Sequence, residues 1–182
     1  MNKKLILLIF LLAIPFSARS QGAAVKTNLL YDATATVNLG AEFALAPRWS
    51  LDLSGNYNMW TIRDRKWKHW LAQPELRYWF CDAFLKHFIG LHALGGQFNV
   101  GNIPFSTLSD NRYQGWGVGA GLAYGYAFAL GRHWNLELEL GAGYVYLNYD
   151  RYACMGCGKK LDSADRHYIG PTKLAVNWVY VF

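Results

Sequence analysis

The chain lacks an apolar run that is long enough for a membrane-spanning helix. Its longest apolar stretch, residues 5–16, is far shorter than the ~20 residues that a spanning helix needs. No cysteine follows this stretch, which excludes a lipoprotein leader. Proline is scarce, with five among 182 residues, and this length allows only one ordinary domain.

The chain also lacks a basic excess that would predict nucleic-acid binding. Its formal net charge is +6. Lys3, Lys4 and Arg19 supply half of that excess, and all three flank the apolar stretch near the N-terminus. Small residues at Ala18 and Ser20 suit signal peptidase. The sequence therefore predicts a signal peptide over residues 1–20 and one mature domain over residues 21–182, without nucleic-acid binding.

Aromatic residues and glycine are abundant instead. Aromatics make up 16% of the chain, with 8 Trp and 12 Tyr, and there are 18 glycines. An exported chain with this composition and few prolines is typical of an all-β protein that faces lipid.

The last stretch of the chain alternates with a period of two, which predicts a strand. One face carries Leu174, Val176, Trp178, Tyr180 and Phe182, while the other keeps Lys173 and Asn177. An apolar face with aromatics near its end is typical of the closing strand of an outer-membrane barrel. Trp178, Tyr180 and Phe182 are therefore the predicted barrel-assembly signal.

The same alternation predicts eight strands along the chain. They cover residues 24–32, 38–45, 49–58, 70–80, 84–95, 115–130, 134–146 and 168–182. Short turns are expected at 46–48, 81–83 and 131–133, and outward connections at 33–37, 59–69, 96–114 and 149–167. The predicted fold is thus an all-β, eight-stranded antiparallel up-and-down transmembrane β-barrel in the bacterial outer membrane, present as a monomer.

The polar parity of the strands is expected to fill the barrel interior with ion pairs, because eight strands leave too little room for a channel. The predicted network comprises Lys26, Glu42, Asp52, Glu75, Arg77, Lys86, Glu137, Glu139 and Lys173, with His92 as a possible addition. Glycine and alanine on the inward parity of residues 115–130 would give the long side chains room. A soluble periplasmic ligand-binding barrel is the alternative, with the apolar parity inside.

Several segments resemble a known family. Residues 26–32 (KTNLLYD), 38–42 (NLGAE), 154–158 (CMGCG) and 168–173 (YIGPTK) are similar to an uncharacterised family of Bacteroidetes outer-membrane β-barrels, a domain of unknown function. Small OmpX/OmpA-type barrels share this architecture. The resemblance implies a fold and a compartment but no established activity. It also implies a link to surface fimbriae or adhesion.

Cys154 and Cys157 lie in the last outward connection. A CxxC pair forms a local disulfide, holds a metal or remains as free thiols. His167, Asp162 and Asp165 are the nearby residues that a zinc site would need. On a cell surface the disulfide is the favoured interpretation.

A lipid A-modifying enzyme is the second alternative for function. Such an enzyme needs a serine activated by a histidine, and the chain has no His-x-Ser pair. The sequence therefore predicts no catalytic residue, no metal and no cofactor.

A basic, tryptophan-containing segment lies in the predicted connection over residues 59–69. Its interaction candidates are Trp60, Arg63, Arg65, Lys66, Trp67 and Lys68. This segment either contacts lipopolysaccharide phosphates as a solvated surface or docks an acidic partner. The predicted function is a non-enzymatic structural or surface-interaction role. Its expected partners are outer-membrane lipid and lipopolysaccharide, the barrel-assembly machinery, and a surface protein whose identity the sequence does not reveal.

Overall fold

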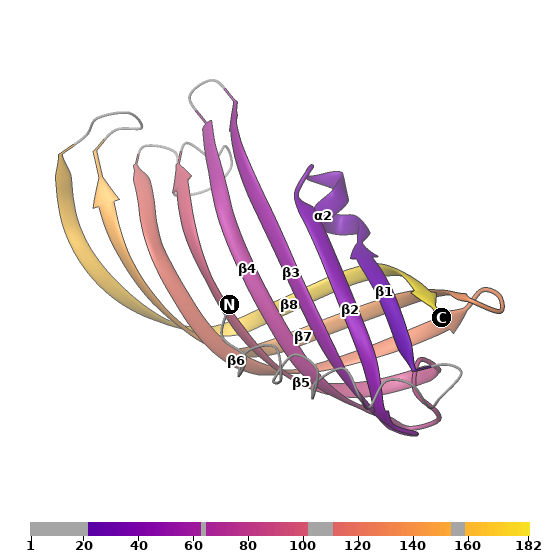
Figure 1. Cartoon of the computed structure of the whole chain (residues 1–182). Helices are drawn as coiled ribbons and strands as arrows, with labels where there is room; N and C mark the ends of the chain where they lie inside the picture. Colours follow the sequence, from indigo (N-terminus) through magenta and orange to yellow (C-terminus); the bar gives the residue numbers. More distant parts are fainter. Residues whose placement is uncertain (1–21, 63–64, 102–110, 154–158) are drawn as a thin grey trace, which may run out of the picture.

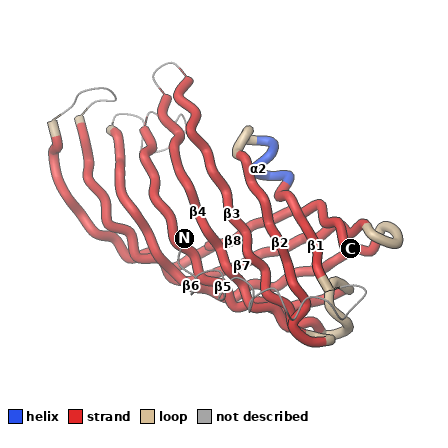
Figure 2. The backbone as a smooth tube through the Cα atoms, viewed as in Figure 1, coloured by secondary structure: helices blue, strands red, loops and turns tan. Residues whose placement is uncertain are grey.

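The computed structural model describes residues 22–62, 65–101, 111–153 and 159–182. Nearly all of them lie in strands (Figure 2). The elements are β1 (Ala23–Asn28), α2 (Leu29–Ala33), β2 (Val37–Ala46), β3 (Trp49–Ile62), β4 (Arg65–Trp79), β5 (Lys86–Gly101), β6 (Arg112–Ala129), β7 (Trp134–Tyr152) and β8 (Lys160–Val181).

The eight strands form a closed antiparallel ring in chain order. Each strand pairs with the next, and β1 closes the ring on β8 with Ala24 opposite Val181 and Asn28 opposite Asn177. The predictions of an all-β fold and of eight up-and-down strands are confirmed. Among the described residues, no helix is long and apolar enough to cross a membrane.

The three short turns lie where the sequence predicts them, between β2 and β3, β4 and β5, and β6 and β7. The opposite ends of the strands differ from the prediction, because most of the described residues within 59–69, 96–114 and 149–167 continue as strand. β3 runs to Ile62 and β4 starts at Arg65, while β8 alone has 22 residues. Polar side chains in these stretches suggested loops, but the backbone ladder continues through them. We call the strand ends opposite the short turns the outer ends. In Figure 1 the outer ends of β3–β8 extend past β1, β2 and α2.

The first strand is shorter than predicted, since it ends at Asn28 and is followed by α2. The side chain of Asn28 accepts a hydrogen bond from the backbone N–H of Leu30 at 3.1 Å and so caps the helix. Asp32 accepts further bonds from Thr27 at 2.8 Å and from Asn38 at 2.7 Å. These local bonds turn the chain out of the strand ladder.

Strands β6, β7 and β8 curve strongly along their length (Figure 1). Glycines permit close backbone contact between β6 and β7. A Cβ built on Gly143 of β7 would lie 2.5 Å from the Cα of Gly121 on β6. Because the Cα of Gly121 belongs to the backbone, it cannot swing away as the end of a flexible side chain could. Gly131, in the turn after β6, has no atom within 4 Å of such a Cβ.

Gly143→Ala should therefore lower the free energy of unfolding by about 1–3 kcal/mol, as overpacking does in other cores. Gly131→Ala is the matched control and should change it by less than about 0.5 kcal/mol. Urea unfolding of both variants in detergent, followed by tryptophan fluorescence, measures the difference. Equal midpoints would show that β6 and β7 do not approach this closely.

Candidate functional site

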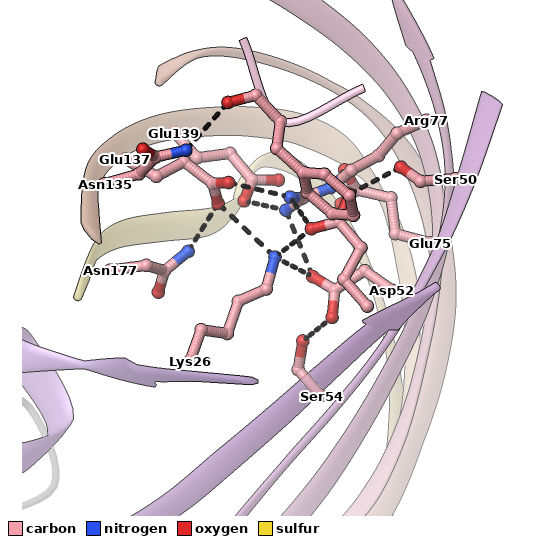
Figure 3. Close-up of polar contacts among 12 residues, drawn as sticks. Lys26, Ser50, Asp52, Ser54, Glu75, Arg77, Asn135, Glu137, Glu139 and Asn177 are labelled. Atoms are coloured by element: carbon pink, nitrogen blue, oxygen red, sulfur yellow. Dashed lines mark hydrogen bonds and ion pairs between the residues drawn. The ribbon is translucent and has the colours of Figure 1, made fainter. Parts of the chain in front are cut away.

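The guanidinium of Arg77 on β4 lies at the centre of a charged cluster inside the ring (Figure 3). Its side chain is fully buried, and all its nitrogens face carboxylates. The contacts are Nε to Glu75 at 2.8 Å, Nη1 to Glu42 at 2.8 Å and to Glu137 at 3.0 Å, and Nη2 to Glu139 at 2.7 Å and to Asp52 at 3.1 Å. Five acids from β2, β3, β4 and β7 thus converge on one cation.

Two lysines from the closing strands complete the cluster. Lys26 of β1 lies 2.5 Å from Glu42 and 3.1 Å from Asp52. Lys173 of β8 lies 2.5 Å from Glu75 and 2.9 Å from Glu139. Strand alternation places these lysines on the inner parity. They enter the cluster from different heights, because Lys26 is opposite Val179 and Lys173 is opposite Gly141.

Neutral groups satisfy the remaining carboxylate oxygens. Ser50 donates to Glu42 at 2.5 Å, Ser54 donates to Asp52 at 2.8 Å, and Asn177 donates to Glu137 at 2.7 Å. Buried charges are tolerated only when they are paired and hydrogen-bonded in this way. The cluster is therefore a structural network that fills the interior.

An apolar plug closes the ring beside the cluster, at the end with the short turns. Its buried members are Ala24, Trp79, Phe84, Phe88, Ala127, Val179 and Val181. The indole of Trp79 donates to Ser50 at 2.8 Å, and the ring of Phe88 lies 4.4 Å from the guanidinium carbon of Arg77. Plug and cluster together occupy the interior with side chains.

Glycines on the inner parity supply the space that these side chains need. A Cβ on Gly90 would overlap the carboxylate of Glu75, and one on Gly125 would lie 2.5 Å from Cε1 of Phe88. A Cβ on Gly121 would likewise lie 2.9 Å from Cε1 of His92. This arrangement agrees with the prediction that inward glycines of residues 115–130 give long side chains room.

The structure brings eight of the nine predicted network residues together: Lys26, Glu42, Asp52, Glu75, Arg77, Glu137, Glu139 and Lys173. The prediction for Lys86 is wrong, because its side chain is exposed. Lys86 has φ of 62° at the junction of the turn and β5, so strand alternation does not yet set its direction. His92 is buried and lies 2.9 Å from the hydroxyl of Thr172.

The predicted network named only charged residues and left out the neutral members of the site. Trp79, Phe88 and Ser50 share the inner parity with the charged residues, and that parity is the signal that finds them. Asn135, which donates to the carbonyl of Phe84 at 2.7 Å, lies on the same parity.

The tryptophans of the predicted interaction segment lie on strands and not in a loop, which corrects the prediction. Trp60 of β3 pairs in register with Trp67 of β4, and both are about half exposed. The indole of Trp60 donates to the carbonyl of Ala35 at 2.5 Å. Lys68 also lies on β4. Arg63 is outside the described residues, while Arg65 and Lys66 begin the β4 backbone.

The predicted assembly signal lies on the outer face of β8. Trp178 is 39% exposed and Phe182 is 58% exposed. Trp134 of β7 packs against Trp178 with ring centroids 5.7 Å apart. The signal peptide, residues 1–20, and the Cys154–Cys157 pair lie outside the described residues. Cys81 is exposed and unpaired in its turn.

In the described part of the chain, the side chains of four histidines have hydrogen-bond partners, and none of those partners is a serine. His87 contacts the hydroxyl of Tyr124, His167 that of Tyr144, His92 that of Thr172, and His133 the carbonyl of Val181. In the described part of the chain, no group of three or more His, Cys, Asp or Glu residues is arranged to hold a metal ion.

Comparison with known proteins complements this geometry. No curated protein matches the chain. A family model does match, and it covers residues 6–182, which include all eight strands and every member of the charged cluster. The chain therefore belongs to the family described as "Protein of unknown function (DUF3575)".

Proposed function

We propose that this protein is an integral barrel of the bacterial outer membrane without catalytic activity, and that it presents the outer ends of β3–β8 at the cell surface. Its role there is structural, or it binds partners at the cell surface. The observation that carries the proposal is the inversion of polarity around the ring: charges are buried inside, and leucines are exposed outside.

A row of leucines crosses four strands on the outer face. Leu51, Leu76, Leu91 and Leu122 are register neighbours on β3, β4, β5 and β6. Leu91 is 58% exposed and Leu122 is 69% exposed. A soluble barrel with a ligand inside would place this parity inward, so the row supports contact with lipid.

Aromatic side chains border the leucine row on both sides. Toward the outer ends lie Tyr57, Trp70 and Trp116, and toward the short turns lie Trp49, Phe80, Tyr126, Phe128 and Trp134. Trp116 and Tyr126 are ten residues apart on β6, or about 33 Å along the strand. At a tilt of about 40° this distance corresponds to a band of about 25 Å, the height of the apolar band of outer-membrane barrels.

The filled interior favours a structural or surface role over transport. The plug and the charged cluster both lie across the ring, and their side chains are almost fully buried. A ring of eight strands has an interior that side chains can fill completely.

Leu122→Arg tests the proposal, because arginine near the middle of a membrane costs a barrel about 2–4 kcal/mol. Leu161→Arg on the outer end of β8 is the matched control, since Leu161 is also an exposed leucine but lies beyond the aromatic border. We expect wild type and Leu161→Arg to fractionate with the outer membrane and to shift in gel mobility on boiling. Leu122→Arg should lose much of the unboiled compact form.

Two results would contradict the proposal. One is recovery of the wild-type protein from the soluble periplasm without a mobility shift. The other is equal folding of both arginine variants in membranes, since an apolar surface in water tolerates arginine at either position.

A further inference from the structure

A polar hollow of about 410 Å³ lies on the outer faces of β3–β7, at the aromatic border. Besides Asn58 and His69, its lining includes the polar residues Lys68, Gln97, Asn99, Gln114, Asn148 and Asp150. These last six residues are register neighbours and form two adjacent rows. Lys68, Asn99, Gln114 and Asp150 form one row, and Gln97 and Asn148 form the other together with Trp70 and Trp116.

An apolar groove of about 480 Å³ adjoins this hollow on the side of the leucine row. Trp70, Gln97 and Trp116 line both spaces, so the two are continuous. The groove exists because small outward residues, Ala72, Ala93 and Gly95, lie between larger neighbours. Each space falls within the size range of ligand pockets.

The polar hollow has unused hydrogen-bonding capacity. The side-chain oxygen of Asn99 is buried without a hydrogen-bond partner among the described residues, and its amide nitrogen reaches Gln114 at 3.4 Å. Asp150 is paired with Lys160 at 2.8 Å and with Ser163 at 2.7 Å. Because Asp150 is already paired, the groups that the hollow offers to a ligand are the ammonium of Lys68 and the side-chain amides of its lining.

A polar space joined to an apolar groove fits an amphiphile that lies along the barrel wall. Amide side chains both donate to and accept from hydroxyl groups, and an ammonium group binds phosphate as a point charge. Tryptophans at the junction present an apolar body and a polar N–H, which suits the boundary between headgroup and acyl chain.

We infer that this composite surface binds a glycolipid of the outer leaflet, with its sugar-phosphate headgroup in the polar hollow and an acyl chain in the groove. The inference rests on the proposed function, because it requires the leucine row to lie in lipid. It adds a specific ligand class and a specific place on the wall.

The test uses full-length protein purified in detergent and titrated with rough-type lipopolysaccharide, which carries lipid A and inner-core sugars. Lys68→Ala combined with Gln114→Ala should weaken binding about tenfold or more, since it removes a charged and a neutral hydrogen-bonding group. Ala72→Phe should weaken it similarly by filling the groove. Arg48→Ala combined with Arg132→Ala, at the turns of the other rim, is the control and should bind like wild type.

The mobility shift on boiling separates the two ideas. If every variant keeps the shift and binds lipopolysaccharide as tightly as wild type does, the glycolipid site is wrong while the membrane barrel stands. The same conclusion follows if heat-modifiable wild type binds phosphatidylethanolamine as well as it binds lipopolysaccharide. Absence of the wild-type protein from the outer membrane would overturn both ideas.

Discussion

Arg77→Met should reduce the free energy of unfolding by about 3–5 kcal/mol, the range measured when one partner of a buried ion pair is removed. The methionine fits the space but leaves five buried carboxylates facing only Lys26 and Lys173. The expected readout is a large fall in the urea midpoint in detergent, together with loss of the compact unboiled form on a gel.

Arg48→Met is the control for this experiment, because Arg48 is exposed in the turn after β2. It removes the same charge from the protein without touching the interior, and its free energy of unfolding should stay within about 0.5 kcal/mol of wild type. If both variants unfold at the same urea concentration, the carboxylates are not held by Arg77.

Trp79→Ala should cost about 3–5 kcal/mol, because it opens a cavity in the plug. Trp79 is completely buried, its ring centroid lies 4.6 Å from that of Phe88, and its indole supports Ser50, which in turn binds Glu42. The substitution therefore removes apolar contacts and one support of the charged cluster together. Thermal unfolding in detergent, monitored by near-UV circular dichroism, measures the loss.

Trp49→Ala provides the comparison, since Trp49 lies at the same rim but points outward and is 43% exposed. Its ring meets that of Tyr78 edge-on, with centroids 5.1 Å apart, on the outer surface. We expect less than half of the destabilisation caused by Trp79→Ala. A Trp49 variant that unfolds as readily as the Trp79 variant would mean that the interior plug contributes no special stability.

Strand parity predicted most of the interior, because a period of two assigns every side chain in a strand to one face. Glu137 and Glu139 on β7, and Lys173 on β8, were placed inward on that basis, and the structure places them in one cluster. Parity says nothing about where a strand begins, so Lys86 was misassigned at the edge of β5.

The outer ends of the strands could not be predicted in the same way. Lys68, Asn99 and Asp150 lie beyond the aromatic border, where polar side chains are expected. In the sequence, a stretch of such polar residues looks like a loop. Their strand structure depends on register partners in distant parts of the chain. The polar hollow depends on the same register and was therefore invisible in the sequence. The α2 helix depends on local bonds of Asn28 and Asp32, which compete with a strand pattern that looks regular.

The composition of the charged cluster has a consequence for the order of events during biogenesis. Lys26 lies on the first strand and Lys173 on the last, whereas every carboxylate of the cluster lies on the strands between them. Lys26 reaches Glu42 on the neighbouring β2, and Lys173 reaches Glu139 on the neighbouring β7, so these contacts do not require closure. By contrast, Arg77 contacts Glu137 and Glu139, and Lys173 contacts Glu75, only across the ring. These contacts join the two halves of the polypeptide, so a chain truncated before β7 lacks them and is more exposed to chaperones and proteases.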